Sequence, residues 1–124
     1  MNEPELEAGL APTPGYRYAD VVGDELFVAG QVPHDESGTL VGPGDAGHQA
    51  AHCLDNLFRL VELHGFAPDD IRRLTVHVVG DDLAGAWDVV RDRFDGEVPP
   101  ATLLGAARLG HPGQLVEIDA TIKR

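Results

Sequence analysis

The sequence predicts a single α+β domain in which two helices cover one face of a mixed β-sheet. The chain has 124 residues, a length that suits one domain. Two segments carry apolar residues at the three- and four-residue spacing of amphipathic helices. Five short β-prone runs surround them, bounded by Gly and Pro. The expected order is β-β-α-β-α-β-β, with no internal repeat and no linker.

The first residues, 1–14, are expected to form a flexible N-terminal tail, so that the domain itself covers 15–124. The tail contains three Pro and three Glu and shows no periodicity. Two β-prone runs follow, 16–22 and 25–30, on either side of Gly23-Asp24. Short runs around a tight turn of this kind predict a β-hairpin.

A long helix is predicted after a Gly-rich loop that extends from His34 to Gly47. The helix begins near Asp45 and runs for about five turns. Gly65 lies where a C-terminal cap glycine belongs. The residues that recur at helical spacing are Ala50, Leu54, Leu57, Leu60, Val61 and His64.

The second half of the chain predicts one more helix and three strands. The strands are expected over 74–79, 101–108 and 115–123, and the helix over 83–94. In the last strand, Val116, Ile118, Ala120 and Ile122 alternate with Leu115, Glu117, Asp119 and Thr121. One face of the sheet is therefore apolar. The other is mixed, as expected if it packs against another subunit around a partly polar cleft.

The charge and cysteine content restrict the partners and the compartment. The net charge is −12, which repels phosphate backbones and anionic lipid, so neither nucleic acid nor a membrane is an expected partner. The single cysteine, Cys53, allows no internal disulfide and is expected to be a core thiol. The acidic N-terminus lacks the apolar stretch of a signal peptide. These features favour a cytoplasmic protein.

Five segments, in order along the chain, resemble the motifs of one family. Residues 23–33 resemble "G-x-x-φ-φ-φ-S-G-Q-x-P" (φ apolar), with Ala29 at the serine. Gln49, Leu54 and Asn56 resemble a helix start "Q-T-x-Q-x-L-x-N", with His52 at the second glutamine. Residues 74–78, 99–106 and 116–120 resemble "V-x-x-T-V-x-V", "P-A-R-T-x-V-G-V" and "V-E-I-E-A". Together they identify the chain as similar to the Rid (YjgF) family.

The resemblance implies a chorismate-mutase-like fold and a homotrimer with three clefts between subunits. Enzymes of the family hydrolyse reactive imines and enamines derived from amino acids to keto acids and ammonia, with no metal or organic cofactor. A small-molecule metabolite and a second copy of the chain are therefore the expected partners.

Three residues match family positions around the cleft. Glu117 corresponds to the motif glutamate that positions the attacking water, and a carboxylate on a rigid strand suits this proton-transfer role. Tyr16 corresponds to a cleft tyrosine, although the sequence leaves Tyr18 open as the alternative. Gly30 lies where the family's backbone faces the ligand.

The chain departs from the family at the carboxylate anchor. The deaminases hold the substrate carboxylate with an arginine, whose position is Ala101, or Thr102 if the alignment slips by one residue. Trp87 replaces a deaminase asparagine. The substrate is therefore expected to be larger and less anionic, and to be bound by apolar contacts near Phe27, Trp87 and Leu103. Another arginine (Arg17, Arg91 or Arg108) remains an alternative anchor.

Two functions stay open on the sequence. The first is a hydrolase or deaminase that acts on a reactive imine or enamine other than a simple amino-acid imine, with Glu117 as acid and base. The second is a non-catalytic trimer that binds a metabolite in the same clefts. A zinc site is not expected, because His48 and His52 have helical spacing but Gln49 stands where an HExxH motif has glutamate.

Overall fold

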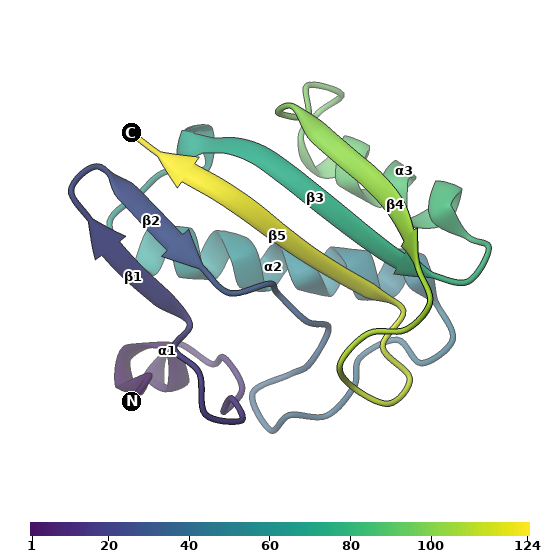
Figure 1. Cartoon of the computed structure of the whole chain (residues 1–124), viewed down its shortest axis with the longest axis horizontal. Helices are drawn as coiled ribbons and strands as arrows, with labels where there is room; N and C mark the ends of the chain where they lie inside the picture. Colours follow the sequence, from purple (N-terminus) through teal and green to yellow (C-terminus); the bar gives the residue numbers. More distant parts are fainter.

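The computed structural model describes residues 1–124 and confirms the α+β prediction (Figure 1). Five strands form one mixed sheet in the order β1-β2-β5-β3-β4. Its elements are α1 (Glu3–Glu7), β1 (Ala19–Val22), β2 (Glu25–Val28), α2 (Ala46–Leu63), the 3-10 helix η1 (Pro68–Asp70), β3 (Ile71–Val79), α3 (Leu83–Arg93), β4 (Ala101–Ala106) and β5 (Val116–Lys123). Helices α2 and α3 both lie behind the sheet, which leaves its front face uncovered.

The strand connections place the last strand in the middle of the sheet. Strands β1 and β2 form the predicted antiparallel hairpin. Strand β5 pairs antiparallel with both β2 and β3. Strands β3 and β4 are parallel and are joined through α3, the crossover that parallel neighbours require. Strand β5 is therefore paired with a neighbouring strand along both of its edges.

Helix α2 begins and ends where its sequence signals indicate. The Asp45 side chain accepts a hydrogen bond from the backbone N–H of His48 at 3.0 Å, which caps the first turn. Gly65 follows the last turn with a φ of 81°, a conformation that L side chains rarely adopt. No helix of the chain combines the length and the apolar character needed to cross a membrane.

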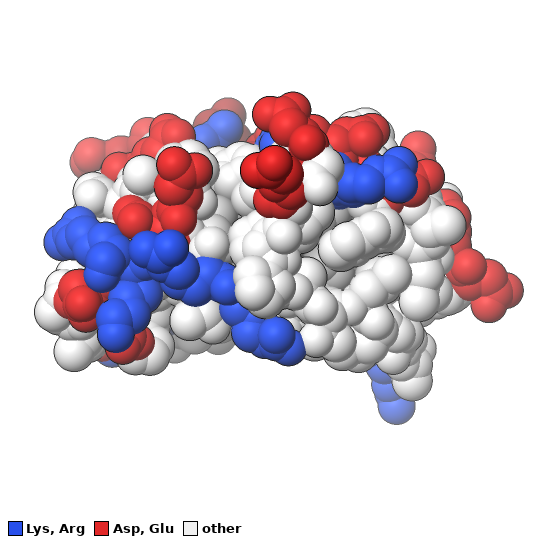
Figure 2. All heavy atoms as spheres, turned by 90° about the horizontal axis from the view of Figure 1, so that it is seen from above, with Lys and Arg blue, Asp and Glu red and all other residues white.

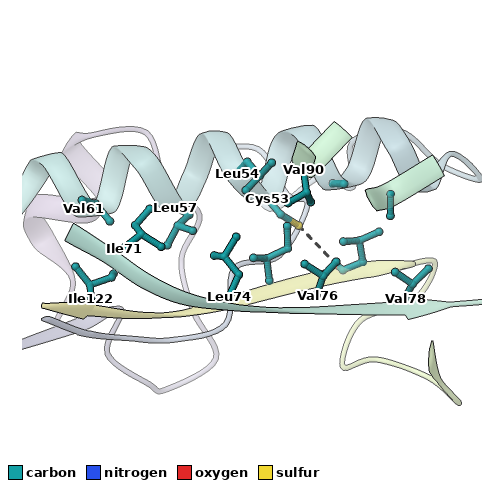
Figure 3. Close-up of a cluster of buried hydrophobic side chains, with 14 of the residues drawn as sticks. Cys53, Leu54, Leu57, Val61, Ile71, Leu74, Val76, Val78, Val90 and Ile122 are labelled. Atoms are coloured by element: carbon teal, nitrogen blue, oxygen red, sulfur yellow. Dashed lines mark hydrogen bonds between the residues drawn. The ribbon is translucent and has the colours of Figure 1, made fainter. Parts of the chain in front are cut away.

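The main core lies between α2, α3 and the back of the sheet (Figure 3). It contains 17 buried residues, mainly leucine, isoleucine, valine and alanine. Cys53 is fully buried in it, and its Sγ lies 3.6 Å from the carbonyl oxygen of Val116. Burial raises the pKa of this thiol well above its ordinary value, so Cys53 is a protonated core residue, as predicted.

The uncovered face of the sheet is half-polar. His77 on β3 and Asp119 on β5 meet on it, with His77 Nε2 2.9 Å from Asp119 Oδ2. Figure 2 shows the acidic side chains gathered along the side that carries the helices. Along the sheet side, which is seen edge-on, uncharged atoms predominate between basic groups, most of which lie toward one end.

Residues 1–14, expected to be a flexible tail, are instead packed against α2. Helix α1 lies in this segment, and Glu5, which is only 4% exposed, has its Oε2 2.6 Å from His64 Nε2. Leu10 forms a small second core with Tyr18 and Leu60. One helical turn with one apolar anchor is too short for a periodic signal, which is why the sequence did not indicate it.

Replacing Leu10 by alanine is expected to lower the free energy of unfolding by about 2 kcal/mol. This value is at the lower end of the range for a buried leucine, because the cluster that contains Leu10 is small. Leu6→Ala is the matched control, since Leu6 is 41% exposed in the same segment. Urea unfolding of both variants measures the difference. Equal stability of the two variants would mean that the segment is the loose tail that the sequence predicted.

Candidate functional site

Three predicted site residues meet in one cleft beside the start of β5. The cleft has a volume of about 330 Å³. It is lined by Pro14, Tyr16, Ala29, Gly30, Val32, Gly110, His111 and Glu117. We call it the β5 cleft. Four separate segments contribute to it: the approach to β1, the chain after β2, the β4–β5 loop and β5 itself.

Gly30 and Glu117 are in close contact. Strand β5 presents Glu117 on the uncovered face of the sheet, opposite His77 of β3. A Cβ added to Gly30 would lie 2.5 Å from Glu117 Oε2, closer than real Cβ contacts allow. Glycine is therefore needed at position 30 for space, and the carboxylate lies against bare backbone.

Gln114 fixes the carboxylate of Glu117 from the other side. Its side chain is buried, and Nε2 donates to Glu117 Oε1 at 3.2 Å and to the carbonyl oxygen of Val116 at 3.0 Å. Gln114 was not among the predicted site residues. A buried amide beside a carboxylate keeps that group in one orientation, as a proton-transfer residue requires.

Two amides on α2 hold the loops around the cleft. Gln49 Oε1 accepts from the Leu115 N–H at 2.7 Å, and its Nε2 donates to the Gly113 carbonyl at 3.2 Å. Asn56 Nδ2 donates to the carbonyl of Val32 at 3.0 Å. The motif residues of the helix thus have a structural explanation, since they tie the cleft walls to a rigid element.

Tyr16, rather than Tyr18, faces the cleft. Burial, followed by the negative charge of Glu117, raises the pKa of Tyr16, so its hydroxyl stays protonated and can donate a hydrogen bond. Tyr18 is buried on the N-terminal side, where its hydroxyl donates to the Ala11 carbonyl at 2.7 Å. Burial raises the pKa of Tyr18 to about 12. Of the two tyrosines that the sequence left open, Tyr16 is the one that lines the β5 cleft.

His111 lines the same cleft and was predicted as part of a turn, not as a residue of the cleft. Its ring packs edge-on against that of His34, with ring centres 4.7 Å apart. The backbone N–H of His111 donates to Gln114 Oε1 at 3.3 Å. His111 is the one basic side chain among the lining residues.

The five other predicted site residues do not reach the β5 cleft within one chain. Ala101, Leu103 and Trp87 are partly buried and pack against the main core. Thr102 lies on the other face of β4, because successive strand residues alternate. Phe27 is 55% exposed on β2 and lines a separate hollow with Arg17. The sequence grouped Ala101, Thr102 and Leu103 because they are adjacent in one motif. Neighbouring residues of a strand point to opposite faces of the sheet, so these side chains are separated in the structure.

An arginine that the sequence did not single out lies beside Thr102. Arg73 Nη2 donates to Thr102 Oγ1 at 2.7 Å from the neighbouring strand β3. A guanidinium therefore lies next to one of the two positions where the family motif holds arginine. Arg108, Arg17 and Arg91 were the alternatives considered from the sequence.

No three His, Cys, Asp or Glu side chains of the chain lie close enough together to hold a metal ion. The chemistry available in the β5 cleft comes from a carboxylate, a phenol and an imidazole around bare backbone. Such a set can hold a water molecule, accept its proton and donate hydrogen bonds to a small polar ligand.

The chain is similar to known proteins over nearly its whole length. A family model described as Endoribonuclease L-PSP matches residues 7–123. A RutC family protein from Pyrococcus abyssi is 32% identical over 116 residues, which cover 92% of this chain and 90% of the relative.

Solved structures agree with the sequence relatives. The structure of E. coli TdcF with bound serine matches with a TM-score of 0.84 and 26% identity, covering 95% of this chain and 94% of that one. A putative endoribonuclease from Thermotoga maritima matches with a TM-score of 0.81 and 30% identity, covering 92% and 91%.

Proposed function

We propose that this chain hydrolyses a reactive imine or enamine in the β5 cleft. The premise is that the chain belongs to the Endoribonuclease L-PSP family, also known as the YjgF or Rid family. The observation that carries this proposal is the position of the Glu117 carboxylate, which lies against Gly30 and accepts a hydrogen bond from Gln114. The family membership inferred from the motifs is confirmed.

Glu117 would act on water. A carboxylate held by Gln114 accepts a proton from a water molecule as the oxygen attacks the imine carbon. The Tyr16 hydroxyl, whose pKa is raised, can orient that water or the ligand by donating a hydrogen bond. General acid–base catalysis of this kind contributes about 10²- to 10⁴-fold to a rate.

A homotrimer forms part of the proposal. The sheet face has no helix over it and carries exposed apolar side chains such as Phe27, as a subunit interface would. Packing of a second copy would supply the residues that one chain does not bring to the cleft, including Thr102 with its neighbour Arg73. A cleft closed in this way favours a ligand whose binding depends on apolar contacts as well as charge.

The expected substrate is a metabolite rather than a nucleic acid or a membrane surface. The net charge of −12 opposes binding to RNA, and the part of the cleft that one chain forms has no lysine or arginine for a phosphate. A reactive imine or enamine metabolite would be met in the cytoplasm, which is the proposed location.

The test is release of ammonia from 2-iminopropanoate generated in situ. The wild-type protein is expected to accelerate it over a control without protein, although less than it accelerates the larger, less anionic imine that the missing arginine predicts. Glu117→Gln is expected to lower kcat/KM by about 100-fold or more. Asp119→Asn is the matched control, because Asp119 is a carboxylate on the same strand that pairs with His77 outside the cleft. It should keep a rate within about threefold of wild type.

A binding protein without turnover is the second candidate, favoured by the serine bound in the related TdcF structure. Calorimetric titration with L-serine separates the two functions. Binding without ammonia release from imines, and weakened by Glu117→Gln, would replace hydrolysis by a sensing or scavenging role. Equal turnover by wild type and Glu117→Gln would remove the carboxylate from the proposal.

A further inference from the structure

The β5 cleft contains one side chain, besides Glu117, that can donate and accept a proton near neutral pH. We propose that His111 is the second proton-transfer residue of the cleft and protonates the ligand nitrogen. This inference rests on the proposed function, because it assigns the nitrogen side of the same reaction. Glu117 takes the proton of the attacking water, and the two residues exchange roles when the intermediate collapses.

The position of His111 in the cleft is fixed by the loop that carries it. The Gln114 side chain accepts from the His111 N–H, and the Gln114 N–H donates to the His111 carbonyl at 3.1 Å. The same Gln114 side chain donates to Glu117. One buried amide therefore positions both proton-transfer residues relative to each other. Gln49 anchors the end of the loop to α2.

His111 and Glu117 both line the β5 cleft, and no ion pair joins them. The ion pairs that histidines make in this chain are His64 with Glu5 and His77 with Asp119, and His111 makes none with Glu117. A cavity of about 330 Å³ separates the groups that line it. A small ligand can therefore lie with its carbon toward the carboxylate and its nitrogen toward the imidazole.

Several titratable groups lie around His111 and its neighbour His34. Glu117 and Tyr16 line the cleft together with His111, the His34 ring packs against its ring, and Asp35 and His52 act in turn on His34. Burial lowers the pKa of His34, and the charge of His111 lowers it further. His34 is therefore neutral near pH 7 and serves as an aromatic support, while His52 Nε2 lies 2.9 Å from its carbonyl oxygen.

Glu117 and His111 together account for every proton that moves in the reaction. Water attacks the C=N carbon and loses a proton to Glu117, while the π pair moves to nitrogen and takes a proton from the His111 imidazolium. The resulting carbinolamine then collapses. The C–N bond breaks as nitrogen takes the proton from Glu117, and neutral His111 accepts the hydroxyl proton as C=O forms. Both residues return to their starting states, and one water is consumed for each imine.

The first measurement is the pH dependence of kcat/KM for 2-iminopropanoate hydrolysis, from about pH 5 to pH 9. His111→Gln is expected to lower the rate by about 100-fold and to remove the limb on which the rate falls as pH rises. A general acid is active while protonated, so that limb belongs to it. His48→Gln, at an exposed histidine on the first turn of α2, is the matched control and should keep both limbs.

The second measurement follows the ring of His111 by NMR in protein labelled at histidine, with the signal assigned by its absence from His111→Gln. Pyruvate oxime is the probe, because it presents a C=N nitrogen and hydrolyses slowly. The His111 signal should shift on titration, and the His48 signal should not.

The outcomes separate the two proposals. Wild-type turnover with an unchanged rate or an unchanged pH profile in His111→Gln overturns the role of His111 and keeps hydrolysis. If the wild-type protein shows no turnover, hydrolysis fails, and the oxime titration decides. A shift of the His111 signal that saturates then keeps the contact between His111 and a C=N nitrogen, and the absence of a shift overturns it.

Discussion

Replacing Gly30 by alanine is expected to remove most of the proposed activity and to leave the fold intact. The new Cβ would lie 2.5 Å from Glu117 Oε2 and 3.0 Å from its carboxyl carbon. The contacted atoms are the end of a flexible side chain, so the carboxylate moves aside while the backbone stays. Misplacement of a reacting group by about 1 Å can cost about 100-fold in rate, and we expect a loss of at least that size.

Ammonia release from 2-iminopropanoate measures the loss, and urea unfolding measures the stability, which should change by less than about 1 kcal/mol. Gly105→Ala is the matched control, because a Cβ there meets only the Val78 carbonyl at an ordinary 3.9 Å. It should retain activity. Full activity in Gly30→Ala would show that the close approach of Gly30 to Glu117 has no part in the reaction.

Replacing Leu57 by alanine is expected to lower the free energy of unfolding by about 3 kcal/mol. Leu57 is fully buried on the face of α2 that packs on the sheet, near Ile71 (Figure 3). The loss combines the apolar surface given up with the cavity left behind. The total stability of a protein is typically about 5–15 kcal/mol, so this loss is a large share of it. It is also larger than the losses expected for Leu10→Ala and Leu63→Ala.

Leu63→Ala is the control on the same helix, because Leu63 is 38% exposed and should cost about 0.5 kcal/mol or less. Both variants are compared by urea unfolding at one protein concentration, since association would add a concentration-dependent contribution. Similar losses for the two variants would contradict the packing of α2 on the sheet.

The helices and strands whose apolar residues recur at a regular spacing could be predicted from the sequence. The stripe of α2 and the alternation of β5 each arise from a contiguous segment that is apolar on one face only. Strand β3 was predicted from Leu74 but begins at Ile71. The intervening Arg72 and Arg73 conceal the start, and Ile71 pairs with Ile122 across an irregularity in the register.

The candidate site could be predicted only where a motif marked it. Tyr16, Gly30 and Glu117 were found through the resemblance, and the structure brings them together. His111 was not, because a His-Pro-Gly sequence resembles any turn. The loop owes its shape to hydrogen bonds from Gln49, 64 and 66 residues away in sequence, and no local pattern carries such information.

The burial of Cys53 makes the surface of this protein free of reactive thiols. A cysteine introduced at a chosen exposed position would be the only one that a spin label or fluorophore could modify under native conditions. Labels on the uncovered sheet face would report distances between copies of the chain. The same single-label strategy, with the label beside the β5 cleft, would follow ligand entry in real time without the need to remove a native cysteine.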